Sequence, residues 1–314
     1  MTSYLIAMLA LVAISTLVGL GLNIQWGLCG LVNFGVAGFF ALGAYVAALV
    51  GLAGGGAWGG LAAAALAGAL ASALLALLAA RLEDDYLAIV TIGFGEIVRL
   101  VMLNEGWLTG GALGLADIPG PFGALEGSPY YPLLFLGFAT AVLASMLAVL
   151  EALARSPFGR ALRAVRDDDV VAATLGKRPL VLRIKAFAIG GAVIGIAGAL
   201  HAFYMTYIDP SQFTPIITAY AFMAVIAGGR GSNLGLLLGA GSIMLLLEAT
   251  RFLKDVIPLL DGTRLAAFRL AMIGVGIILL MILRPQGLFR EPRLETRHVL
   301  PPASRPVPQE ETAT

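Results

Sequence analysis

Two groups of polar side chains in this 314-residue chain have the types and spacing to act on a solute. Glu96 and Arg99 lie three residues apart in an apolar run, which places them on one face of a helix. Either charge alone in hydrocarbon would cost roughly 2.5–3.5 kcal/mol. The pair therefore either lines a polar path or gate, where a zwitterion would suit it, or forms a structural ion pair between helices. Asn33, which ends a glycine-rich stretch, either caps a helix or lines the same path.

The other chemically capable residues do not form a catalytic set. His201 lies in an apolar stretch and the second histidine, His298, lies near the end of the chain, so we expect a packing role for His201. The single cysteine, Cys29, excludes an internal disulfide and a cysteine-based zinc site. The residues around Lys177 lack the earlier glycine and the hydroxyl of a phosphate-binding loop. We expect no cofactor, no metal and no enzymatic activity in this chain itself.

Composition defines the fold class. The chain is 59% hydrophobic and 12% charged, and its mean hydropathy is +0.93. Its apolar runs have the length that crosses a bilayer as a helix, and they lack the alternation of a membrane barrel. The sequence predicts an all-α, polytopic transmembrane bundle with about nine spans. We expect the spans at about 3–22, 28–52, 58–80, 86–104, 131–153, 186–208, 215–228, 233–252 and 265–283.

Charge asymmetry predicts the orientation of these spans. The segment at about 154–185 is rich in arginine and lysine, so the positive-inside rule places it in the cytoplasm. The loop at 105–130 carries three acids and no lysine or arginine, and alternation of spans places it outside. We therefore expect an external N-terminus and a cytoplasmic C-terminus. Residues 1–291 would form one transmembrane domain, followed by a disordered cytoplasmic tail at 292–314.

The basic segment has the features of a short exposed helix. Ser156 can cap a helix with Pro157 at its first position. The arginines then project around a helix whose apolar stripe comprises Phe158, Ala161, Leu162 and Val165. Three interpretations stay open from the residues alone: a solvated loop, a helix lying on the bilayer, or a helix docked in a groove of a partner. Only docking would explain the small residues that keep the helix slim.

Six motifs in order along the chain carry a resemblance to a known family. They are Gly30–Gly35, Asp85–Ile97, Leu108–Gly111, Ser156–Arg166, Gly228–Ser232 and Arg284–Leu288. With these motifs the chain resembles the M-type permeases of ATP-driven ABC importers for branched-chain amino acids. The resemblance covers about residues 25–290. It is specific to the permease family and less specific to the substrate, because importers of urea and short-chain amides have similar permeases.

The resemblance implies a set of partners and a coupling site. The basic helix would be the coupling helix that contacts an ATP-binding subunit through Pro157, Phe158, Gly159, Arg160, Ala161, Leu162, Arg163 and Arg166. The assembly would contain a second, H-type permease, two ATP-binding subunits and an extracytoplasmic substrate-binding protein, in a bacterial inner membrane. Its substrate would be a small amino acid, and no nucleic acid is implied. An alternative of another class is an ion-coupled secondary transporter or channel with Glu96 as its proton or ion site.

Overall fold

The computed structural model of the chain describes residues 2–79, 82, 84–125, 127–256 and scattered positions between 271 and 288. In these residues the structure is helical apart from loops and one isolated bridge between Leu115 and Ile208, so the predicted all-α class is confirmed. The long helices are α1 (Thr2–Leu22), α2 (Val36–Val50), α3 (Gly56–Leu78), α4 (Asp84–Asn104), α6 (Tyr131–Arg155), α9 (Pro179–Met205), α10 (Ile216–Gly228) and α11 (Asn233–Val256). The shorter elements are the π-helical turns η1 (Asn23–Leu28) and η2 (Gly51–Gly55), α5 (Gly106–Thr109), η3 (Gly111–Leu113), η4 (Gly123–Leu125), α7 (Pro157–Asp167), α8 (Asp169–Thr174) and η5 (Pro210–Gln212).

Six helical stretches of the described residues are long and apolar enough to cross a membrane by length and composition. They are Tyr4–Leu28, Val36–Leu78, Asp85–Asn104, Tyr131–Arg155, Pro179–Met205 and Pro210–Gly228, and a shorter apolar helix covers Asn233–Leu247. This confirms a polytopic helical protein but not the count of nine. The expected ninth span at 265–283 and the tail at 292–314 lie outside the continuously described residues.

The stretch Val36–Leu78 is 43 residues long but is not one straight helix. Gly54 has a φ of +87°, a conformation that glycine adopts without a steric penalty. On either side of this break α2 and α3 pack against each other. The predicted glycine-rich turn between the second and third spans is therefore present, and the stretch forms a helical hairpin.

The expected second span begins later than predicted. Residues 29–35 are not helical, and α2 starts at Val36 rather than at residue 28. The reason lies in η1, where the first helix widens into a π-turn before the chain reverses at Gly30, which has a φ of +87°. Asn33 then accepts a hydrogen bond of 2.8 Å from the backbone N–H of Gly35, so the local turn satisfies the polar backbone.

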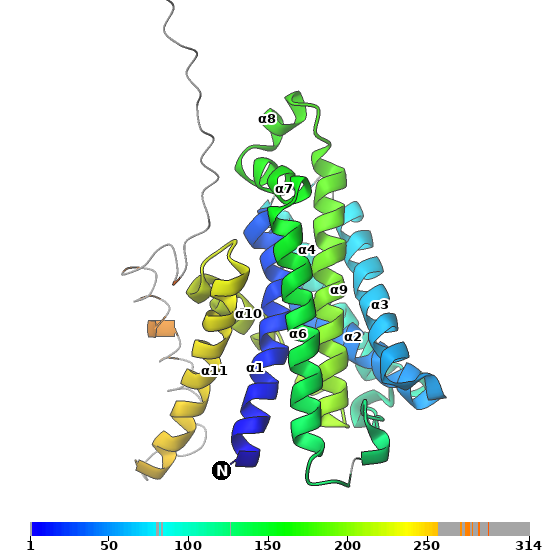
Figure 1. The fold of residues 1–314 in the computed structure, drawn as a ribbon. Coiled ribbons are helices and arrows are strands. Elements are labelled where there is room, and N and C mark those ends of the chain that lie inside the picture. The colour runs from blue at the N-terminus through cyan, green and yellow to red at the C-terminus, as the bar shows by residue number, and fades with distance from the viewer. Residues whose placement is uncertain are drawn as a thin grey trace, which may run out of the picture.

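Helix α9 is the centre of the bundle, and small residues let its neighbours approach it closely. It packs most extensively on α3 and α2 (Figure 1). A Cβ at Gly191 would collide with the backbone oxygen of Gly68, and one at Gly195 would collide with that of Ala64. The predicted role of the Gly191–Gly195 spacing in helix packing is confirmed, since close backbone contact is how small residues stabilise helix pairs in membranes.

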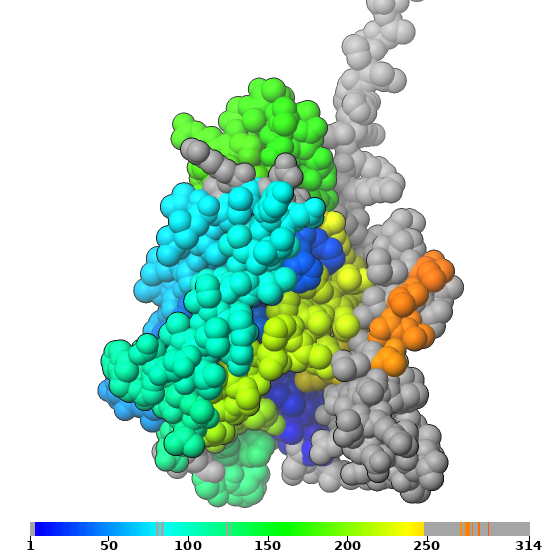
Figure 2. All heavy atoms as spheres, turned by 180° about the vertical axis from the view of Figure 1, so that it is seen from behind, coloured from blue at the N-terminus to red at the C-terminus, as the bar shows by residue number. Residues whose placement is uncertain are grey.

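The two ends of the bundle differ. Helices α7 and α8 lie together at one end, and the N-terminus and the 105–130 loop lie at the other (Figure 1). Seen from the opposite side, α4 forms an uncovered ridge across the face of the molecule (Figure 2). The most apolar part of α4 is only 17% buried, against 28–56% for the other membrane-length stretches.

Candidate functional site

Helix α7 forms where the sequence predicts it. The side chain of Ser156 accepts hydrogen bonds from the backbone N–H groups of Phe158 and Gly159, at 3.2 and 3.4 Å. Pro157 follows in the first helical turn, where its missing N–H is not needed. The helix ends at Asp167, and Asp168 then caps α8 by accepting from the N–H of Val171 at 2.9 Å. The basic segment is thus two short helices rather than one.

The apolar stripe of α7 packs on its own chain. Gly159, Leu162 and Val165 are buried, and Phe158 packs against the core. A Cβ at Gly159 would collide with the backbone of Leu153 and Ala154 at the end of α6. The expectation that small residues and an apolar stripe serve a partner or the bilayer is therefore wrong for this face, because the protein itself occupies it.

The opposite face of α7 is open to solvent. Pro157, Arg160, Ala164 and Asp167 are exposed and follow the helical spacing of three and four residues. Ala161 is partly exposed beside them. A partner that contacts α7 therefore meets one proline, one arginine and one carboxylate rather than the predicted row of hydrophobic residues.

Two of the predicted coupling arginines bind backbone carbonyls of this chain. Arg163 donates to the oxygen of Ala154 at 3.0 Å, which fastens α7 to the end of α6. Arg166 donates to the oxygen of Gly27 in η1 at 2.6 Å, and its side-chain stem lies against Gly30. A cation at a helix C-terminus also interacts favourably with the helix dipole. These arginines hold α7 in place.

The turn η1 connects α7 to the glycine-rich turn between α10 and α11. Arg230 donates to the oxygen of Trp26 at 3.2 Å, and its guanidinium lies 4.8 Å from the centroid of the Trp26 ring. Asn23 accepts from the N–H of Gly231 at 3.0 Å and donates to Asn233 at 3.0 Å. Three separate segments therefore meet at the end of the first helix.

A second buried polar group lies beside the first. Gln25 donates to the backbone oxygen of Phe187 at 3.1 Å and accepts from Asn33 at 2.7 Å. Ser72 donates to the same oxygen of Phe187 at 2.7 Å. The side chains of Gln25, Asn33 and Ser72 are fully buried. Asn33, a predicted path residue, here joins η1, α3 and α9, and its proposed contact with a solute stays a prediction.

The predicted pair Glu96–Arg99 is formed. The Nε of Arg99 lies 3.0 Å from one oxygen of Glu96 and 3.2 Å from the other, a bidentate arrangement. Both side chains are accessible in this chain, 28% for Arg99 and 44% for Glu96. The pair is remote from α7 in the fold, so the structure does not bring the predicted coupling and path residues into one site.

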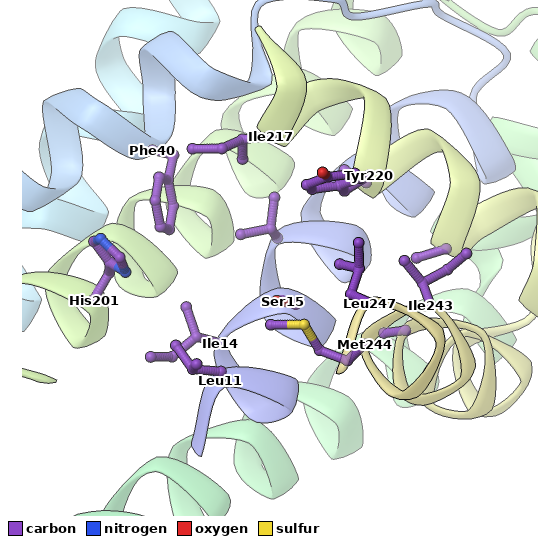
Figure 3. A pocket seen from close by; sticks show the side chains of 14 residues that line it. Leu11, Ile14, Ser15, Phe40, His201, Ile217, Tyr220, Ile243, Met244 and Leu247 are labelled. Carbon is purple, nitrogen blue, oxygen red and sulfur yellow. The ribbon is translucent and has the colours of Figure 1, made fainter. Parts of the chain in front are cut away.

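An apolar pocket of about 310 Å³ lies between α1, α10 and α11 (Figure 3). Phe40 of α2 and His201 of α9 close one side of it (Figure 3). Its polar side chains are Ser15, His201 and Tyr220, and no charged side chain lines it. The pocket suits an uncharged apolar group and offers no counter-charge to a charged one.

A short hydrogen-bonded chain leads from this pocket to the end of α9. His201 Nε2 lies 3.4 Å from Gln212 Oε1, and Gln212 donates to Asp209 at 2.8 Å. Asp209 also accepts from the N–H of Ser211 at 2.8 Å, which confirms the predicted turn. Burial raises the pKa of the Asp209 carboxyl, but the hydrogen bonds from Ser211 and Gln212 together outweigh it and hold this pKa below its ordinary value.

Sequence inspection missed the residues that join these parts. Asn23, Gln25, Ser72 and Asn233 are buried amide or hydroxyl side chains at the ends of apolar runs. Their partners are 47 to 210 residues distant in the chain, so no local pattern pairs them. The available signal was that polar residues in membrane-length segments rarely face lipid.

These features define the class as a polytopic helical membrane protein that presents a short amphipathic helix at one end of its bundle. The chain belongs to the family described as the branched-chain amino acid transport system / permease component, whose sequence profile matches residues 4–283. This agrees with the expectation drawn from the six motifs.

Named relatives give the same assignment. The chain is 35% identical over 301 residues to the high-affinity branched-chain amino acid transport system permease protein LivM of Escherichia coli K12, covering 88% of this chain and 68% of the relative. It is 36% identical to LivM of Salmonella typhimurium, covering 87% and 67%. It is 28% identical to the autoinducer 2 import system permease protein LsrC of Salmonella paratyphi B, covering 64% and 54%. No solved structure gives a significant match.

Proposed function

We propose that this chain is the membrane-spanning permease subunit of an ABC importer for branched-chain amino acids. The observation that carries the proposal is its similarity to LivM proteins over nearly nine-tenths of its length. The chain would work with a second, H-type permease, two ATP-binding subunits and an external substrate-binding protein. ATP hydrolysis would belong to those separate subunits, and this chain would catalyse no reaction.

Helix α7 supports the coupling part of the proposal. It is short, lies at one end of the bundle and exposes Arg160 while its other face is anchored in the protein. A helix fixed in this way can transmit a displacement to the membrane-spanning part, whereas a mobile loop cannot. We assign this end to the cytoplasm and the 105–130 loop to the exterior. The full topology would comprise about nine spans with an external N-terminus, in a bacterial inner membrane.

The path residues in this proposal are Glu96, Arg99 and Asn33. The ion pair is accessible on α4, so it can meet a zwitterionic solute if a second subunit closes the path. The apolar pocket has the chemistry to accept an aliphatic side chain but not an ammonium or carboxylate group. Tight selection of the whole amino acid would therefore take place in the external binding protein.

Reconstitution tests the proposal directly. Proteoliposomes that contain this chain, its partner subunits and ATP should take up labelled leucine when the binding protein is present. Arg160→Glu should abolish uptake while the complex still purifies, because Arg160 is exposed and anchors nothing in the core. Normal ATP-dependent uptake in that variant would exclude α7 as the coupling helix.

Two alternatives give different results in the same vesicles. An importer of urea or short-chain amides would take up those solutes and not leucine, and the 28% identity to an autoinducer 2 permease shows that relatives differ in substrate. An ion-coupled transporter or channel would need no ATPase, so uptake by this chain alone under an ion gradient would exclude the proposed class. The Glu96→Gln variant would then lose that uptake.

A further inference from the structure

Helix α4 is attached to the rest of the protein by one narrow face. Leu87, Thr91 and Met102 are buried, and Gly95 lies directly against Gly38 of α2. The remaining surface carries exposed apolar side chains, among them Ile89 (66%) and Ile97 (61%). Among the described long helices α2 is the main neighbour of α4. Most of this helix therefore faces lipid or another molecule.

The ion pair lies on the uncovered side of α4. At 3.6 residues per turn, Glu96 is roughly 140–160° around the helix from Thr91 and Val98, which face the protein. It follows Asp84 by about 18 Å along a helix of about 31 Å, so it lies near the middle of the span. An accessible carboxylate and guanidinium at that depth are costly against acyl chains, and such pairs face protein or water.

Gly93 adds an independent observation on the same side of α4. A Cβ built at Gly93 meets no atom within 4 Å, so the protein itself has no steric need for glycine there. It lies between Ile89 and Ile97, one helical turn from each, and leaves a notch in an otherwise apolar ridge. Such a notch lets a second helix approach the backbone closely.

We propose that this face of α4, defined by Ile89, Gly93, Glu96, Ile97, Arg99 and Leu100, is the contact surface for a second membrane-spanning permease subunit. The occupant is a helix with an apolar ridge and its own acid–base pair at the same depth. A two-fold axis along the membrane normal brings equivalent helices together at one depth. A face with one acid and one base is complementary to its own equivalent, so each carboxylate gains a second cation. The identity of the occupant rests on the proposed function.

A pair of glycine substitutions tests the contact. Gly93→Leu should leave the chain alone as abundant and as heat-stable as wild type, because the space is open. In cells that make all subunits it should reduce the co-purified second permease about tenfold, since a leucine overpacks a close helix contact. The matched control is Gly137→Leu on α6, which is equally open within the chain and has no ion pair nearby. Normal assembly of Gly93→Leu would overturn the proposal.

Photo-cross-linking keeps the test valid if Gly93→Leu impairs the isolated chain. A benzophenone amino acid at Ile97 should give an adduct with the second permease, and one at Leu70 of α3 should give lipid adducts. Both positions are 61% exposed. Lipid adducts alone from Ile97, adducts with a copy of this chain, or a permease adduct only from Leu70 would overturn the inference. Normal leucine uptake beside any of these results would leave the proposed function standing, whereas absent uptake with a permease adduct from Ile97 would contradict only the function.

Discussion

At the scale of single residues, arginine side chains divide into those that hold the protein together and those that are available to a partner. Arg163 and Arg166 donate to backbone oxygens of α6 and η1. Arg160 is exposed, and its nearest backbone contact, with the oxygen of Arg155, is long at 3.4 Å. The same residue type therefore has two roles on one short helix, and charge alone does not distinguish them.

Replacing Arg166 should reveal its anchoring role. Arg166→Ala removes a charged hydrogen bond from a side chain that is only 17% exposed, so it should lower the free energy of unfolding by about 1–2 kcal/mol. Thermal unfolding of the purified chain in detergent measures the change. Arg160→Ala is the control and should leave the melting temperature unchanged. Equal melting temperatures for Arg166→Ala and wild type would contradict the anchoring role.

The turn at Asp209 should make a small pH-dependent contribution to stability. Its folded pKa is below the ordinary value, so its stabilising effect is complete above that ordinary value and is lost as pH falls through the folded pKa. Asp209→Asn should therefore be less stable than wild type at pH 7. The two proteins should converge as the pH falls below about 4. Melting curves across this range test the prediction, and a constant difference between the two proteins would refute it.

At the scale of elements, glycine determines how α7 meets α6. Gly159 lies where any side chain would collide with the backbone of Leu153 and Ala154. A bulky residue at this position therefore cannot test contact with a partner, because it first breaks a joint inside the chain. The exposed face of α7 is the place for such tests.

Gly159→Leu should consequently damage the chain itself. We expect a lower melting temperature of the purified chain and faster proteolysis between α6 and α7, since the helix must shift to make room. Ala164→Leu is the matched control on the exposed face of α7 and should leave both measurements unchanged. If Gly159→Leu melted like wild type, the observed α6–α7 contact would not be present in solution.

Local sequence signals predict the elements better than their contacts. The Ser156 cap, Pro157 in the first turn and the Gly191–Gly195 spacing are recognisable because each depends on neighbours in the chain. The π-turn η1 was not predictable, since Asn23–Leu28 continues an apolar helix in composition. The burial of Leu162 was missed because an amphipathic stripe does not say which surface covers it.

At the scale of the whole molecule, the two ends of the bundle should face opposite sides of the membrane. In a Cys29→Ser background, an impermeant thiol reagent should label Leu113→Cys on intact spheroplasts, because this residue is 82% exposed in the 105–130 loop. Arg160→Cys should react only after the membrane is opened. Labelling of Arg160→Cys from outside would reverse the proposed orientation and remove α7 from the reach of an ATPase.

The sequence also predicts the whole assembly only in part. Hydropathy indicates the membrane class and the motifs indicate the family, which the profile match to residues 4–283 confirms. The number of spans was not predictable with the same accuracy, because the hairpin at Gly54 and the segment 29–35 interrupt apolar runs without charged residues. Glu96 and Arg99 were recognised as a pair, but their accessibility depends on the packing of α4 against α2.

The hydrogen bond between Arg166 and Gly27 joins positions 139 residues apart in the chain. A torque applied to α7 from outside the bilayer is therefore delivered to the first helix, and not only to the helices that flank α7 in sequence. The other end of that lever carries Leu11 and Ile14, which form part of the wall of the apolar pocket. Rotation of one surface helix would thereby change the volume of a cavity inside the membrane without altering a single residue that lines it.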